Sequence, residues 1–276
     1  MRNARFSRTS LTKQAFVFTS LFTVSGLTLS EETETPSWDV SAPNYSAEVQ
    51  EIDLNVTEGT WMNLDVSPDG KHIAFDLLGD IYQIPITGGE ATPLLSGHAW
   101  EVQPQYSPDG RFLAFTSDRN GADNIWVVDL TNPDNMHQIT HESFRLLNNP
   151  SWHPSGDYLV AKKHFTTSRS LGTGEVWLYD ANVDQALTRG NLQGSVLVKR
   201  PSPAFQKELG EPTFSADGAS VFYIQNTTPG NTFIYHEDSN GEVMAIKRYD
   251  LESGEIEKVV GGAGGAVRPT PSPDGK

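Results

Sequence analysis

The sequence predicts an all-β protein, a β-propeller of four-stranded antiparallel blades, because one turn motif and one strand pattern recur along it. The motif is a Ser-Pro-Asp-Gly turn, or a variant of it, followed by an apolar triplet. It occurs at residues 67–75, 107–115, 153–161 and 215–223, and it begins again at residues 272–276. Proline presets φ, aspartate bonds the nearby backbone, and glycine takes the positive φ that closes the turn. A strand therefore flanks each turn on both sides.

Each repeat contains two further strands. An apolar stretch with an aromatic residue follows each triplet, at residues 80–82, 124–126, 175–177 and 247–249. Turns are expected next, at residues 87–89, 132–134, 182–184 and 252–254, and then a short outer strand, as at residues 92–95 and 137–140. Helical repeats are the alternative for such periods, but apolar residues rarely recur here at helical spacing.

The expected propeller covers residues 48–276, with blades near 57–96, 97–142, 143–190 and 208–260 and a fifth beginning at 267. Residues 48–56 are expected to form an additional strand that completes the last blade and closes the ring. Because the last strand has no partners, we expect an incomplete ring, the front part of a longer protein. A closed four-bladed ring is the alternative. The loops between the second and third strands of the repeats lengthen along the chain, and a long exit loop is expected at 189–210. Both sets of loops emerge on the same face of a propeller, so this face, the loop face, is the expected binding face.

The N-terminus has the pattern of a secretory signal. Residues 1–30 contain four basic residues and no acidic one, then an apolar run, then small residues. We therefore predict a signal peptide at 1–30, a flexible leader at 31–47, and a periplasmic or secreted protein that does not span the membrane after cleavage. An uncleaved membrane anchor is the alternative, but the apolar run is short for one.

Composition excludes several classes of function. The formal net charge of −15 disfavours nucleic acid as a partner, because it repels a phosphate backbone. The chain has no cysteine, so it has no disulfide, thiolate metal site or cysteine nucleophile. No residue pattern predicts a catalytic centre, a metal site or a cofactor site within the chain.

The repeats resemble the TolB-like propeller of periplasmic proteins, in the Ser-Pro-Asp-Gly turns and in residues 118–126. Residues 58–70, 75–82 and 261–266 resemble, more narrowly, the N-terminal propeller of a secreted amidohydrolase fusion. That resemblance implies a metal-dependent barrel beyond this chain, which would hold a divalent metal. No residue of this chain inherits a catalytic or metal-binding role. The alternatives are a stand-alone TolB-like module that binds envelope proteins and the propeller of a serine oligopeptidase.

Two groups of residues are candidates for binding a ligand or partner. His98 and Trp100 lie in a loop that enters the second blade, and Arg119 lies in a hairpin loop. The second group is basic: residues 158–207 contain seven basic residues against three acidic ones, in a chain of opposite sign. Its candidates are Lys162, Lys163, Arg169, Lys199 and Arg200. They could bind an anionic partner or an acidic catalytic domain of the same protein, although scattered solvated charge is the simpler interpretation.

Overall fold

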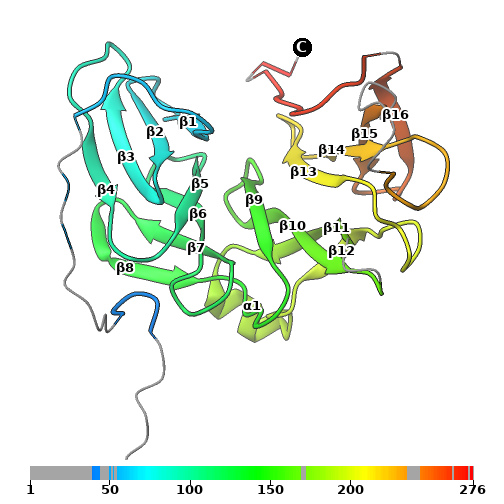
Figure 1. The fold of residues 1–276 in the computed structure, drawn as a ribbon, viewed down its shortest axis with the longest axis horizontal. Coiled ribbons are helices and arrows are strands. Elements are labelled where there is room, and N and C mark those ends of the chain that lie inside the picture. The colour runs from blue at the N-terminus through cyan, green and yellow to red at the C-terminus, as the bar shows by residue number, and fades with distance from the viewer. Residues whose placement is uncertain are drawn as a thin grey trace, which may run out of the picture. The chain divides into compact units, whose positions relative to one another are not determined.

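The computed structural model describes residues 39–43, 50, 52, 55–168, 172–234, 243–262, 264–272 and 274–275. Sixteen strands and one short helix are formed among them, and Figure 1 shows their arrangement. They are β1 (Leu64–Val66), β2 (His72–Leu77), β3 (Asp80–Pro85), β4 (Thr92–Leu95), β5 (Glu101–Tyr106), β6 (Phe112–Ser117), β7 (Asn124–Asp129), β8 (Asn132–Gln138), β9 (Leu147–Trp152), β10 (Tyr158–Thr166), β11 (Gly172–Asp180), α1 (Val183–Arg189), β12 (Ser195–Val198), β13 (Leu209–Phe214), β14 (Ser220–Asn226), β15 (Met244–Asp250) and β16 (Ile256–Gly261).

The strands form four separate four-stranded sheets, each antiparallel and each in chain order from the innermost strand to the outermost. These are β1–β4, β5–β8, β9–β12 and β13–β16, hereafter blades 1 to 4. The predicted propeller of four-stranded antiparallel blades is therefore confirmed. No described helix has the length and apolar character needed to span a membrane.

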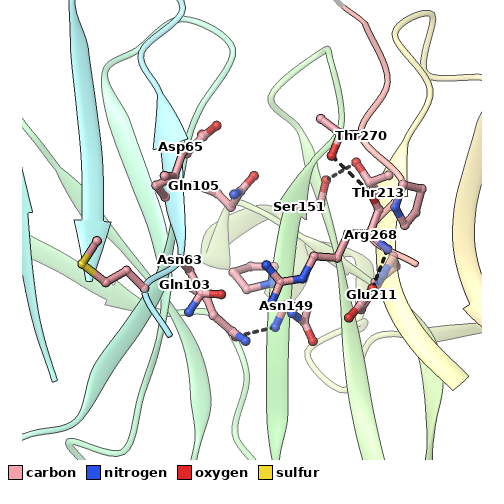
Figure 2. A pocket seen from close by; sticks show the side chains of 15 residues that line it. Asn63, Asp65, Gln103, Gln105, Asn149, Ser151, Glu211, Thr213, Arg268 and Thr270 are labelled. Atoms are coloured by element: carbon pink, nitrogen blue, oxygen red, sulfur yellow. Dashed lines mark hydrogen bonds between the residues drawn. The ribbon is translucent and has the colours of Figure 1, made fainter. Parts of the chain in front are cut away.

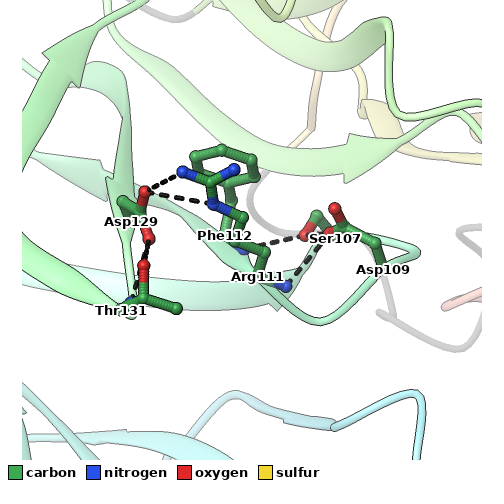
Figure 3. A network of polar contacts seen from close by, with 6 residues as sticks. All are labelled: Ser107, Asp109, Arg111, Phe112, Asp129 and Thr131. Atoms are coloured by element: carbon green, nitrogen blue, oxygen red, sulfur yellow. Dashed lines mark hydrogen bonds and ion pairs between the residues drawn. The ribbon is translucent and has the colours of Figure 1, made fainter.

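The repeated turn is closed by the same side-chain hydrogen bonds in blades 1, 2 and 4. In blade 2, Ser107 Oγ donates to Asp109, and the Asp109 carboxylate accepts the N–H of Arg111. Ser107 Oγ in turn accepts the N–H of Phe112, which starts the next strand (Figure 3). Blades 1 and 4 repeat these bonds. In blade 3, His153 replaces the serine and its ring Nδ1 accepts the N–H of Ser155. The backbone bonds from His153 N–H to the Tyr158 carbonyl and from Gly156 N–H to the His153 carbonyl match those of the other turns, so the variant turn has the same shape.

A second carboxylate fixes the far end of the same hairpin. Arg111 Nε and Nη2 donate to Asp129 Oδ2 at 3.1 and 2.7 Å, and Thr131 donates to Oδ1 (Figure 3). The hydrogen bonds from Arg111, then those from Thr131, hold the pKa of Asp129 well below its usual value of 3.8. A lowered pKa in the folded state stabilises the protein above the unfolded-state pKa, and this stabilisation is lost as the pH falls.

We expect Asp129→Asn to lower the melting temperature at pH 6 and to make the acid denaturation limb shallower. Wild type and variant should therefore converge between about pH 5 and pH 2, because the missing carboxylate titrates there in the unfolded chain. Thermal unfolding followed by circular dichroism at several pH values measures this. A difference in melting temperature that stays constant down to pH 2 would contradict the assignment.

The core lies between the apolar faces of successive blades. The side chains of each apolar triplet point alternately toward the following and the preceding blade. The middle residue faces the following blade, and the outer two face the preceding one. Thus Ala74 of blade 1 packs in one cluster with Leu113 and Phe115 of blade 2, and all three are fully buried. Blades 2 and 3, and blades 3 and 4, join in the same way. The alternation of side chains along a strand, together with the repeat, produces this stacking.

The first and fourth blades each keep one apolar face that no described residue covers. Val66 precedes the turn of blade 1 and is 43% exposed, whereas Tyr106 at the same place in blade 2 is 7% exposed. On blade 4, Val260 is 51% exposed, while Leu95, which occupies its position in blade 1, is 8% exposed.

Several local predictions need correction. The turn expected at 132–134 lies at residues 130–131, because β8 already begins at Asn132. The turn expected at 182–184 is instead the start of α1, where the Asn182 side chain accepts the N–H of Gln185 as an N-cap. This helix displaces the outer strand, so blade 3 extends to Val198, beyond the expected limit at 190, and the expected loop at 189–210 contains β12.

The N-terminal predictions lie largely outside the described residues, including all of the expected signal peptide. Of the strand expected at 48–56, residues 50, 52, 55 and 56 are described, and none belongs to a strand. At the other end, the fifth repeat starts as the earlier ones do. Ser272 Oγ donates to Asp274, and the N–H of Gly275 donates to the Ser272 carbonyl.

Candidate functional site

The innermost strand of blades 2, 3 and 4 carries an irregularity at the same place. Gln103, Asn149 and Glu211 have φ values of 58°, 54° and 47°, and each precedes a proline. The strand register shifts there in all three blades, as expected for a β-bulge. Arg268, with φ 54° before Pro269, begins the same feature in the fifth repeat. Proline has no N–H to donate to the ladder, so the Xaa-Pro pair breaks the pairing and turns the side chain before it out of the sheet.

These bulges line a cavity of about 540 Å³ at the centre of the blades (Figure 2). Its polar side chains occupy two positions of the repeat, four and two residues before the turn. The first set is Asn63, Gln103, Asn149, Glu211 and Arg268, and the second is Asp65, Gln105, Ser151, Thr213 and Thr270. Every blade thus contributes one residue of each set to this axial cavity.

Part of the first set fastens neighbouring blades together. Asp76 of β2 accepts the N–H of Gln103 at 2.8 Å, and the Gln103 side-chain oxygen accepts the N–H of Asn149 at 2.7 Å. Glu211 accepts the N–H of Arg268 at 2.9 Å. Figure 2 shows the last two contacts. In each case a side chain of one blade satisfies the backbone N–H of the bulged residue in the next blade. The bulges therefore fix the blades to one another as well as lining the cavity.

The second set adds one half-buried carboxylate and several hydroxyl and amide groups. Asp65 accepts the N–H of Tyr106 at 2.7 Å, and burial raises the pKa of Asp65. Ser151 Oγ donates to Thr213 Oγ1 at 3.3 Å. The lining contains no histidine, lysine or cysteine, and its ionisable side chains are Asp65, Glu211 and Arg268. The cavity is therefore equipped to bind polar groups.

The described residues contain no group of three histidine, cysteine, aspartate or glutamate side chains placed to hold a metal ion. Any divalent metal that the amidohydrolase resemblance implies would thus need ligands from elsewhere in the protein. That expectation stays untested.

The first group of sequence candidates lies on the loop face of blades 1 and 2. His98 and Trp100 are both exposed in the loop before β5. The Trp100 ring lies against Gly79, where an added Cβ would be 2.7 Å from the ring. Arg119 pairs with the buried carboxylate of Glu101, and its guanidinium carbon lies 5.2 Å from the centroid of the Trp126 ring. Burial raises the pKa of Glu101, and the hydrogen bond from Arg119 opposes that rise. Ligand binding by His98, Trp100 and Arg119 stays a prediction.

The second group gathers around blade 3, largely as ion pairs. Lys162 pairs with Glu208, and the buried Lys163 pairs with Glu142 and stacks on Trp177 at 4.2 Å. Arg200 Nε lies 3.7 Å from Glu175, whereas Lys199 is exposed. Arg169 lies outside the described residues. Partner binding by these cations remains a prediction, but their charge is mostly compensated within the protein.

Sequence reasoning missed the bulged residues of the axial cavity and Arg145 on the loop face. It did not single out the bulged residues, although the recurrence of Xaa-Pro four residues before every turn except that of blade 1 was a readable signal. It also missed Arg145, which stacks 4.6 Å from the Phe165 ring in the loop between β8 and β9. A single arginine between Phe144 and Leu146 carries no sequence pattern that marks it.

Four-stranded sheets packed face to face about a polar axial cavity define a β-propeller. The chain belongs to the TolB β-propeller domain family, whose model matches residues 52–202. It is 31% identical over 168 residues to the uncharacterized protein Atu1656 of Agrobacterium fabrum, covering 58% of this chain and 53% of that protein. It is 29% identical over 162 residues to the uncharacterized peptidase YuxL of Bacillus subtilis, covering 51% of this chain and 24% of the peptidase.

Solved structures show the same fold. A protein assigned as TolB from Agrobacterium tumefaciens has a TM-score of 0.58 at 19% identity, over 77% of this chain and 66% of that one. TolB from Acinetobacter baumannii has a TM-score of 0.54 at 16% identity, over 78% of this chain and 45% of that one. The chain thus spans about half the length of Atu1656 and about a quarter of YuxL.

Proposed function

We propose that this chain is the propeller module of an exported hydrolase and that it acts by binding. The observation that carries the proposal is the axial cavity, which is lined by two sets of polar side chains. A propeller of this kind can dock a catalytic domain of the same protein on its loop face and admit substrate groups to its cavity. Membership of the TolB family and the signal-like N-terminus support a periplasmic or secreted location.

The proposed catalytic domain is a metal-dependent amidohydrolase barrel. Its support is the sequence resemblance of residues 58–70, 75–82 and 261–266 to propellers that precede such barrels. A serine peptidase domain is the second candidate, and its support is the relative YuxL, which is named a peptidase. A stand-alone module that binds envelope proteins is the third, and its support is the likeness to TolB.

Assays on the intact natural protein and on this chain alone distinguish the candidates. We expect hydrolysis of amide substrates by the intact protein that is abolished by a zinc chelator such as 1,10-phenanthroline, and none by this chain. Labelling by a fluorophosphonate probe, together with turnover that resists the chelator, would favour the serine peptidase domain over the amidohydrolase barrel. An intact protein that neither turns over substrate nor reacts with the probe would overturn the hydrolase proposal, and turnover by this chain alone would overturn the binding role.

A further inference from the structure

Two arginines from separate segments converge on one aromatic ring at the loop face of blade 3. Phe165 lies near the end of β10, Arg145 in the loop before β9, and Arg200 just after β12. The guanidinium carbons of Arg145 and Arg200 lie 4.6 and 4.3 Å from the centroid of the Phe165 ring. Stacking on a ring orients each guanidinium while leaving its N–H edges available to acceptors. We call Arg145, Phe165 and Arg200 the arginine clamp.

The carboxylates near the arginine clamp already have other partners within the protein. Glu142 is paired with Lys163 and Glu208 with Lys162. Glu175 accepts the indole N–H of Trp177 and lies 3.7 Å from Arg200 Nε.

Neither arginine of the clamp is fully satisfied within the part of the chain that the structure describes. Arg145 makes no ion pair there, and Arg200, whose Nε lies 3.7 Å from Glu175, has a buried Nη1 without a hydrogen-bond partner. A guanidinium that lacks acceptors favours binding of an external carboxylate.

Exposed apolar side chains flank the clamp. Phe144 is 75% exposed and Leu146 is 44% exposed, on either side of Arg145 in one short loop. Large apolar side chains presented next to cationic ones are typical of protein interaction sites, where a buried aromatic anchor is combined with arginine. The surface thus offers one place for a carboxylate and one for an apolar side chain, within the same loop.

We propose that the arginine clamp, with Phe144 and Leu146, binds an acidic peptide segment of a partner protein that carries glutamate or aspartate next to an aromatic residue. The carboxylate accepts hydrogen bonds from Arg145 and Arg200, and the aromatic residue packs on Phe144. The inference deepens the proposed binding function, since it names the chemistry of the partner. It needs no catalytic domain, so its failure would leave the assays of hydrolysis unaffected.

Fluorescence anisotropy with a fluorescein-labelled peptide of glutamates around one tryptophan tests the proposal. We expect this chain to bind it at least tenfold more tightly than the same peptide with glutamine in place of glutamate. Arg145→Gln should weaken binding about tenfold and Phe144→Ser by several-fold, both at unchanged melting temperature because both side chains are exposed. The matched control is Lys71→Gln, which removes another exposed cation, in the turn of blade 1.

Each result decides the question. A loss confined to Arg145→Gln and Phe144→Ser supports the site. Equal loss in Lys71→Gln would mean general charge attraction and would overturn it. No preference for glutamate over glutamine would also overturn it. Binding that is indifferent to the tryptophan and fully displaced by inorganic phosphate would show a simple anion site and would overturn the peptide assignment.

Discussion

Replacing Phe115 by alanine is expected to lower the free energy of unfolding by about 3–5 kcal/mol, the cost of removing a fully buried phenylalanine from a core. Phe115 closes the triplet of blade 2 and has no exposed surface, because it packs between blades 1 and 2. Urea denaturation followed by tryptophan fluorescence and circular dichroism measures the loss.

The repeat supplies its own control. Phe75 occupies the position of Phe115 in blade 1, where no described blade covers that face, and its ring is half-buried against Tyr82. Phe75→Ala should therefore cost only about 1–2 kcal/mol, in proportion to the smaller apolar area that it buries. Equal losses for the two variants would contradict the assignment of these faces, since the same residue at the same repeat position would then be buried to the same extent.

Asp76→Ala is expected to lower the free energy of unfolding by about 2–4 kcal/mol, because it removes a buried acceptor from two backbone donors and one side-chain amide. Asp76 is 3% exposed and accepts three hydrogen bonds at 2.8 Å: the N–H and side-chain amide of Asn63, and the N–H of Gln103 in blade 2. The same denaturation experiment measures the loss. Amide hydrogen exchange should also accelerate at Gln103 before it does at Asn149, whose acceptor is retained.

Asp134→Ala is the matched control for charge. Asp134 is exposed on β8, so its removal changes the net charge by the same amount, and the expected effect is within about 0.5 kcal/mol. If the two variants lost the same stability, or if exchange at Gln103 were unaffected, the fastening of blade 1 to blade 2 through Asp76 would be wrong.

The repeated architecture was predictable because its determinants are local. Serine, aspartate and glycine of the turn bond to one another within five residues, and the triplet follows at fixed spacing. The helix α1 was not predictable in the same way. Its seven residues replace a turn and move the outer strand further along the sequence, yet β12 still pairs with β11, so nothing in the repeat demanded or forbade the helix.

The axial cavity could be read from the sequence only in part. Three Xaa-Pro pairs at one repeat position mark the bulges, but that their side chains meet depends on how the blades stack around the axis. The ion pairs of two lysines were likewise not predictable from the sequence. Lys162 and Lys163 looked alike as loop-face cations, yet their counter-ions Glu208 and Glu142 come from loops of different length that no pattern aligns.

In the structure, tandem sheets stacked face to face hold this protein together. Hydrogen exchange measured by mass spectrometry across the whole chain is the most direct test of this stacking. Blades 2 and 3 are covered on both faces, so β6, β7, β10 and β11 should be the most protected strands. Their counterparts β2, β3, β14 and β15, each with one uncovered face, should exchange faster. Protection that is equal across all four blades, or greatest in blades 1 and 4, would contradict the stacking and with it the scaffold on which the proposed binding depends.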